Sequence, residues 1–197
     1  TSKEKGPENV LYYEDGRSIR TSGYYGVYKI SSTWSNVDDA EGNFSGMHFH
    51  TIQGHQFNDF LAVGGGIGLD VIGGKDFRTY TFLPIYVDIR GFPIRGKVSP
   101  YYALSLGYGF AFDAFDNFDD EADERYSGGI MIAPALGLRF ASRKKGQFLL
   151  ELGYKMQYTD AQYQHREFGN PFTSGYFIYV NRETFFRRLE VSFGWIF

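Results

Sequence analysis

The sequence lacks cysteine and has little of what marks several common protein classes. It contains no Cys and only 2 Trp among 197 residues, which excludes disulfide bonds and thiolate chemistry within the chain. The formal net charge is −3, so no basic surface points to a nucleic-acid partner. The most apolar run, residues 98–112, contains Pro100, Gly107 and Gly109 and falls short of the roughly 20 residues that a membrane-spanning helix needs.

Glycine and aromatic residues are abundant, and apolar side chains recur at every second position. The chain has 25 Gly, 16 Tyr and 20 Phe, a composition that favours strands and turns over helices. A period of two places alternate side chains on opposite faces of a strand. The pattern predicts strands at residues 23–35, 44–57, 61–72, 78–90, 102–113, 130–140, 148–159 and 185–197.

The connections between these segments alternate in length. One set is longer (36–43, 73–77, 114–127, 160–184), and the other is short (58–60, 91–98, 141–146). An even number of strands with long and short connections at opposite ends is typical of a transmembrane up-and-down barrel with periplasmic termini. We therefore predict an all-β fold, an antiparallel barrel of about eight strands at residues 23–197 with short periplasmic turns and longer extracellular loops. Residues 1–22 show no clear pattern and are predicted to form a periplasmic tail or plug.

The size of the side chains predicts which face meets lipid. One face of each strand is bulky and apolar, and the other carries small residues such as Gly66, Ala103 and Ala135. The interior of an eight-stranded barrel has room only for modest side chains, so the bulky face is expected outside. Aromatic residues at the strand ends are expected to form two girdles at the membrane interfaces. Tyr24, Tyr25, Tyr101, Tyr102, Phe140, Phe148, Trp195 and Phe197 fall at one end, and Trp34, Phe44, Tyr80, Phe110, Phe112, Tyr158 and Phe185 fall at the other.

The C-terminal segment carries a resemblance to a known group. Leu189, Val191, Phe193, Trp195 and Phe197 alternate up to a terminal Phe, which resembles the assembly signal of outer-membrane barrel proteins. The overall plan is similar to the small eight-stranded barrels of the OmpA and OmpX type. This resemblance implies a Gram-negative outer membrane after removal of a signal peptide. It also implies contact with lipid, lipopolysaccharide and the barrel assembly machinery, with Trp195 and Phe197 in the assembly signal.

The face predicted to line the lumen carries charges of both signs. They are Asp70, Asp88, Arg90, Arg139, Glu151, Lys155, Arg188 and Glu190, together with Lys29. Buried charges must be paired, so we expect an internal network of ion pairs. A narrow polar pore is the alternative, for which an eight-stranded barrel leaves little room.

Three histidines lie close together in the weakest of the eight segments. His48 and His50 share one face of the predicted strand, and His55 lies on the other. The run from His48 to Thr51 is similar to the His and Ser chemistry of outer-membrane lipid A deacylases, with Thr51 in place of Ser and facing away from His50. The two histidines could instead bind a metal together with a carboxylate. We expect ordinary lumen or interface histidines, with no catalytic residue, metal or cofactor.

Two of the long loops have compositions that suggest binding. Carboxylates in one loop could hold divalent cations: Asp116, Asp119, Asp120, Glu121 and Asp123. Aromatic side chains in another suggest contact with a protein or glycan: Tyr163, Phe168, Phe172, Tyr176 and Phe177. The alternative for the second loop is an extension of the strands above the membrane, for which residues 176–180 have a suitable composition.

From these features we predict a structural or interaction protein rather than an enzyme. An accessory subunit that binds other outer-membrane proteins is one form of this role. The alternatives are a lipid-modifying enzyme of the lipid A deacylase kind and a narrow pore. No nucleic-acid partner is expected.

Overall fold

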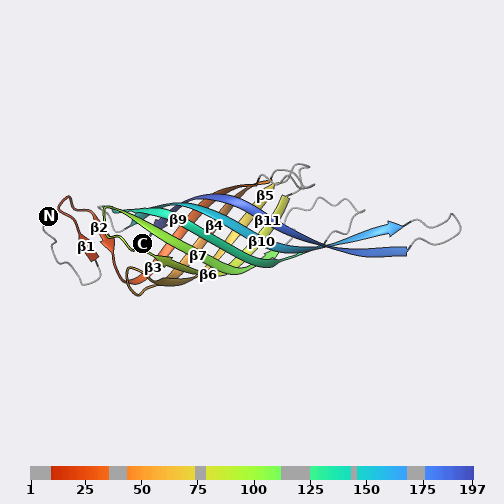
Figure 1. Cartoon of the computed structure of the whole chain (residues 1–197), viewed down its shortest axis with the longest axis horizontal. Coiled ribbons are helices and arrows are strands. Elements are labelled where there is room, and N and C mark those ends of the chain that lie inside the picture. Colours follow the sequence, from red (N-terminus) through yellow and green to blue (C-terminus); the bar gives the residue numbers. More distant parts are fainter. Residues whose placement is uncertain (1–9, 36–43, 74–78, 112–124, 143–145, 168–175) are drawn as a thin grey trace.

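The computed structural model describes residues 10–35, 44–73, 79–111, 125–142, 146–167 and 176–197, which form strands and turns. No helix in these residues is long and apolar enough to span a membrane. Each wall strand pairs antiparallel with the next, and the last pairs with the first, so the sheet closes into a barrel (Figure 1). The wall strands are β3 (Gly23–Ser35), β4 (Phe44–Gln56), β5 (Ala62–Gly73), β6 (Thr79–Gly91), β7 (Val98–Ala111), β9 (Gly129–Phe140), β10 (Gln147–Glu167) and β11 (Tyr176–Ile196).

The eight predicted segments all form wall strands, which confirms the predicted barrel. The last two strands are longer than the alternation indicated. β10 and β11 remain paired from Gln147↔Ile196 to Glu167↔Tyr176, so much of the connection predicted at 160–184 is strand. The structure therefore corrects the predicted loop to a hairpin. A short strand, β8 (Arg125–Ser127), pairs with β10 where the hairpin leaves the barrel.

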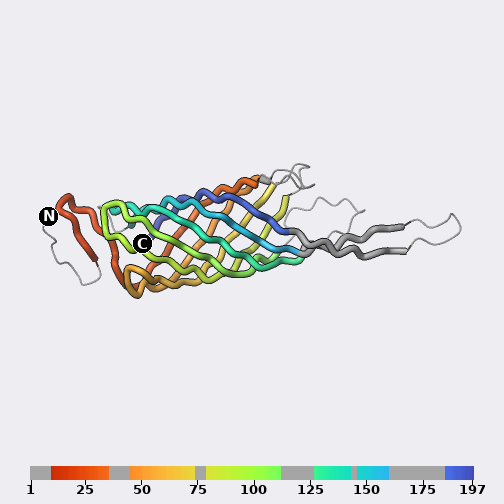
Figure 2. Tube along the Cα trace, in the orientation of Figure 1, coloured from red at the N-terminus to blue at the C-terminus, as the bar shows by residue number. Residues whose placement is uncertain are grey.

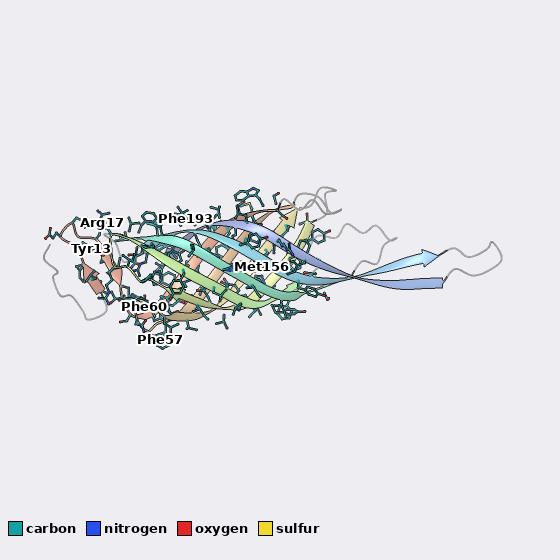
Figure 3. All side chains as sticks on the ribbon, viewed as in Figure 1. Tyr13, Arg17, Phe57, Phe60, Met156 and Phe193 are labelled. Atoms are coloured by element: carbon teal, nitrogen blue, oxygen red, sulfur yellow. The ribbon has the colours of Figure 1, made fainter. Side chains whose placement is uncertain are left out.

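The wall alternates as predicted, with bulky apolar side chains outside. Leu136 and Phe193 are 70% and 57% exposed, whereas Asp70 and Arg90 are completely buried in the lumen. Figure 3 shows Phe193 on the barrel wall away from the rim. An apolar outer face and a polar inner face are the arrangement that a bilayer requires of a closed barrel.

Three of the aromatic residues assigned to the interfacial girdle are inside the barrel. Tyr25 and Tyr101 are 1% and 2% exposed, and Tyr80 packs against the buried Phe82 and Phe186. The prediction was wrong for these three because odd-numbered positions of β3 and β7 and even-numbered positions of β6 face the lumen. The side chains of Phe44 and Phe112 lie outside the described residues.

A small hairpin precedes the barrel. β1 (Val10–Tyr12) and β2 (Ser18–Arg20) pair antiparallel beyond the short-turn end, where the C-terminus also lies (Figures 1 and 2). The turn between them uses Gly16 at φ 78°, a conformation that favours glycine. A β-bridge from Ser18 to Ser142 joins the hairpin to the β9–β10 turn, and Ile19 is completely buried. Residues 10–20, part of the predicted tail or plug, thus form a folded element against this end of the barrel.

Candidate functional site

Asp70 is the centre of the polar layer that fills the barrel lumen. It projects inward from β5 and accepts hydrogen bonds from Lys155 of β10 and from His50 Nε2 of β4, the latter at 2.7 Å. His48 Nδ1 also lies 2.8 Å from the same carboxylate oxygen, but the angle of this contact does not meet the requirement for a hydrogen bond. Asp70 and Lys155 are buried, so each supplies the charge that compensates the other.

Glu151 forms a second centre nearer the short turns. Its carboxylate lies 3.0 Å from Lys29 Nζ, accepts a hydrogen bond of 2.9 Å from Tyr101 and lies 3.7 Å from Arg90. Lys29 also lies 3.0 Å from Glu190 of β11. Lys29 of β3, assigned to the lumen from the sequence, therefore joins two carboxylates on the adjacent strands β10 and β11.

Arg90 and Arg188 complete the layer. Arg90 pairs with Asp88 two residues before it on β6, and Asp88 also accepts a 3.0 Å hydrogen bond from Ser105. Arg188 donates to the Gln157 side-chain oxygen at 2.8 Å. Four cations thus share the layer with four anions: Lys29, Arg90, Lys155 and Arg188 with Asp70, Asp88, Glu151 and Glu190. The layer is balanced in charge when the histidines are neutral.

Glycines in β5 make room for the large rings of this layer. A Cβ added to Gly68 would lie 2.8 Å from His50 Nε2, and one added to Gly66 would lie 2.8 Å from the Tyr86 hydroxyl. Both distances are too short for a real side chain. The small inner face of β5 therefore positions His50 and Tyr86, whose hydroxyl lies 3.0 Å from His50 Nδ1.

Apolar side chains cover the polar layer on the long-loop side. Ile72, Phe82 and Phe186 form a buried cluster there. On the short-turn side, Tyr101 packs against Phe92 with ring centroids 5.4 Å apart. The charged groups are therefore enclosed by side chains at both ends.

The histidine pair has a hydroxyl partner that the sequence did not indicate. Thr33 Oγ1 of β3 lies 2.7 Å from His48 Nε2, with Asp70 at the opposite ring nitrogen. A hydroxyl, an imidazole and a carboxylate in this order are the groups of a hydrolytic triad, but Thr33 and Asp70 are completely buried. This contact depends on the register in which β3 and β4 pair, which the local sequence of either strand does not indicate. Thr51, the residue considered from the sequence, is on the other face of β4.

The same cluster has the donor set of a metal site. His48, His50 and Asp70 each offer a ligand atom within 4.8 Å of the others. Two imidazoles and a carboxylate suit a divalent transition metal. Lys155 already pairs with Asp70, and adding a dication to a layer balanced in charge carries an electrostatic cost.

Solved structures of bacterial barrels resemble this fold. OprG from Pseudomonas aeruginosa has a TM-score of 0.59 at 14% identity, over 90% of this chain and 97% of its own. NspA, a neisserial surface protein, has a TM-score of 0.55 at 16% identity, over 90% and 98%. AlkL, solved in lipid bilayers, has a TM-score of 0.54 at 15% identity, over 100% and 94%. The chain therefore has the fold of small outer-membrane β-barrel proteins. No protein-family model and no curated sequence matches it.

The β10–β11 hairpin extends beyond the wall of this barrel. In Figure 1 the paired strands continue well past the rim at the long-loop end. β11 pairs with β3 only as far as Leu189↔Trp34, and β10 pairs with β8 at residues 160–162. Beyond these pairs, the two strands have only each other as partners among the described residues.

The remaining predicted residues fall in different places. The alternate C-terminal residues ending in Trp195 and Phe197 project from the outer face of β11. Tyr163, Tyr176 and Phe177 belong to the extended hairpin strands. The other candidates lie outside the described residues: Phe168, Phe172, Asp116, Asp119, Asp120, Glu121 and Asp123.

Arg139 is separate from the lumen network to which the sequence assigned it. It lies at the short-turn end of β9, with its guanidinium 4.1 Å from the Phe92 ring centroid. It donates one hydrogen bond of 3.2 Å, to the carbonyl of Arg20 in the N-terminal hairpin. No carboxylate of the described residues lies within ion-pair distance of it, so Arg139 belongs to the barrel mouth.

Proposed function

We propose that this barrel is a closed, non-catalytic membrane anchor that holds the β10–β11 hairpin outside the cell for contact with a partner protein or glycan. The observation that carries the proposal is the continuous pairing of β10 and β11 to Glu167↔Tyr176, far past the last contact of β11 with β3. A two-stranded ribbon is marginal in water without further packing. Attachment to a rigid barrel fixes its base and lowers the entropy that it loses on binding.

The filled lumen supports an anchoring role over transport. Asp70, Asp88 and Arg90 have no exposed surface, and moving them would separate buried charges at a cost of several kcal/mol. The expected conductance of the purified barrel in planar bilayers is therefore zero. Steady single-channel currents would support the narrow pore instead.

The hairpin is tested by site-specific photo-crosslinking in native outer membranes. Replacing Tyr176 by p-benzoylphenylalanine is expected to give discrete adducts with a protein or glycan. The same replacement at Tyr154, on the lipid-facing wall of β10, is the matched control and is expected to give none. Absence of adducts at Tyr176 and at a second hairpin position, Tyr163, would overturn the proposal.

A lipid-modifying enzyme is the second candidate, favoured by the Thr33–His48–Asp70 arrangement. Burial of all three groups opposes it, because a lipid substrate has to reach the hydroxyl. Changing His48 and His50 to Ala, and in a separate variant Thr33 to Val, tests it through the mass profile of lipid A. A profile identical to the wild type removes the enzymatic role, whereas loss of one modified species in both variants establishes it.

A further inference from the structure

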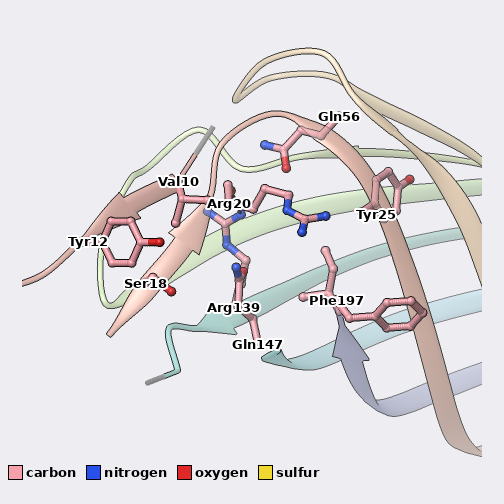
Figure 4. A pocket seen from close by; sticks show the side chains of 10 residues that line it. Val10, Tyr12, Ser18, Arg20, Tyr25, Gln56, Arg139, Gln147 and Phe197 are labelled. Atoms are coloured by element: carbon pink, nitrogen blue, oxygen red, sulfur yellow. Dashed lines mark hydrogen bonds between the residues drawn. The ribbon is translucent and has the colours of Figure 1, made fainter. Parts of the chain in front are cut away.

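A cavity of about 230 Å³ lies between the N-terminal hairpin and the short-turn mouth of the barrel. Strands β1 and β2 supply one wall, and the inner rim of the barrel supplies the other (Figure 4). Part of the lining is apolar, from Val10, Tyr12, Ile196 and Phe197. The polar lining includes Arg20, Arg139 and Tyr25, so the cavity offers both kinds of contact.

Arg139 has unused hydrogen-bonding capacity in this cavity. Its side chain is 1% exposed, and its Nε and one terminal nitrogen have no hydrogen-bond partner. The Phe92 ring and the Arg20 carbonyl compensate part of the charge. A buried guanidinium without a carboxylate within ion-pair distance is costly. Arg188 shares this condition but donates to Gln157 inside the lumen layer, whereas Arg139 lines the mouth cavity.

Other groups at the same cavity add to its preference for an anion. Arg20 brings a second guanidinium from β2, and Figure 4 shows its side chain and that of Arg139 reaching into the space from two sides. Tyr25 also lines the cavity, with its hydroxyl directed away from the two guanidinium groups and toward Gly64 of β5 (Figure 4). Arginine guanidinium groups bind carboxylates and phosphates in proteins through paired hydrogen bonds.

We propose that this mouth cavity binds an oxyanion, a phosphate or carboxylate group, carried by a small molecule with an apolar portion. Arg139 Nε and its free terminal nitrogen donate to two of the oxygens, and Arg20 contributes a second positive charge. The apolar lining contacts the remainder of the molecule. The N-terminal hairpin forms a wall of this cavity, which gives it a role independent of the β10–β11 hairpin at the other end.

The binding test uses the whole chain refolded in an uncharged maltoside detergent. Inorganic phosphate, hexanoate and dihexanoyl phosphatidic acid are titrated separately while the ¹⁵N Nε–H resonance of Arg139 is followed. A saturable shift with inorganic phosphate or hexanoate identifies a free anion as ligand, and a shift with the short-chain lipid alone identifies a lipid headgroup. Absence of a saturable shift with all three overturns the proposal.

Two variants locate the site. Affinities of the variants and the wild type are compared by isothermal titration calorimetry, because Arg139→Gln lacks the Arg139 resonance. Arg139→Gln is expected to weaken binding by roughly tenfold or more, in keeping with the loss of charge-assisted hydrogen bonds. Arg95→Gln is the control, because Arg95 lies at the same rim but is half exposed and pairs with Asp59 at 2.6 Å. Equal affinity in Arg139→Gln and wild type overturns the proposal. Heat-modifiable electrophoretic mobility checks folding, and the wild-type resonance decides the question should Arg139→Gln not fold.

Discussion

The barrel and the β10–β11 hairpin are built from the same two strands but are held in different ways. Up to Gln157, β10 is paired on both sides, with β9 and β11, and residues 160–162 pair with β8 and β11. Past β8, the described strands have only each other. Inside the barrel, their inward residues Glu151, Lys155 and Glu190 join a network of buried ions, whereas the hairpin has no barrel around it.

Within this one pair of strands, we assign stability to the part inside the barrel and recognition to the part that extends beyond it. Closed strands bury their polar groups and have no free edges, which suits a membrane. The extended ribbon keeps free edges, which can pair with other chains. We therefore expect substitutions in the lumen to change the free energy of unfolding, and substitutions in the hairpin to change binding.

The largest expected effect comes from breaking the centre of the lumen. Asp70→Asn leaves Lys155 buried without its counter-ion, and loss of one partner of a buried ion pair costs about 3–5 kcal/mol. Urea unfolding in lipid vesicles, followed by tryptophan fluorescence, measures the change. The double variant Asp70→Asn/Lys155→Met is the control and is expected to recover at least half of the loss. Equal stability of Asp70→Asn and wild type would contradict the paired network.

The outer wall gives the next effect. Leu152 lies on the lipid face of β10, opposite Leu136 and Val191 on the neighbouring strands. Leu152→Arg is expected to cost about 2–4 kcal/mol, as charged residues do near the bilayer midplane. Phe57→Arg, at the exposed β4–β5 turn, is the matched control with an expected cost of about 0–1 kcal/mol. The same unfolding assay compares the two, and equal costs would place Leu152 away from the bilayer.

Shortening the hairpin is expected to have little effect on stability. Residues 163–180 are replaced by Asn-Gly, which forms a two-residue turn between Gln162 and Asn181, already a cross-strand pair. Because the removed strands pair only with each other among the described residues, we expect the free energy of unfolding to change by less than about 1 kcal/mol. Refolding yield and urea unfolding provide the measurement. A large loss would show that the hairpin is part of the barrel's stable core.

The sequence predicted the wall better than the lumen contacts, for a physical reason. Alternation is local, so the side of the sheet that Leu136 or Asp70 occupies follows from residue parity once a strand is recognised. Tyr25 and Tyr101 were assigned to the interface by their place at a strand end, although parity directs them inward. Parity is therefore the stronger rule, and the terminal aromatics should be assigned by it.

Contacts across the lumen depend on register and closure, which alternation does not encode. Thr33 meets His48 because β3 and β4 pair with Thr33 opposite Gly46. A shift of one residue in this register would turn the inward side chains of one of the two strands toward the lipid. Lys29 and Glu151 are far apart in sequence and meet only because the barrel closes. The separation of Arg139 from the network likewise follows from its depth in the lumen, near the rim.

The smallest effect concerns the tether of the N-terminal hairpin. Asp15 lies 2.7 Å from Arg17 and 2.7 Å from Lys97 of the β6–β7 turn. The hydrogen bonds from Arg17 and then Lys97 hold the pKa of the Asp15 carboxyl well below its ordinary value of 3.8. A carboxyl with a lowered pKa in the folded state stabilises the tether fully above the ordinary pKa, and this contribution is lost as the pH falls below it.

We expect hydrogen exchange in the β1–β2 hairpin, corrected for intrinsic rates, to be constant from pH 7 to about 5 and faster below about 4. Asp15→Asn should show the faster exchange at every pH, and unchanged exchange in this variant would mean that the Ser18↔Ser142 bridge and buried Ile19 hold the hairpin alone.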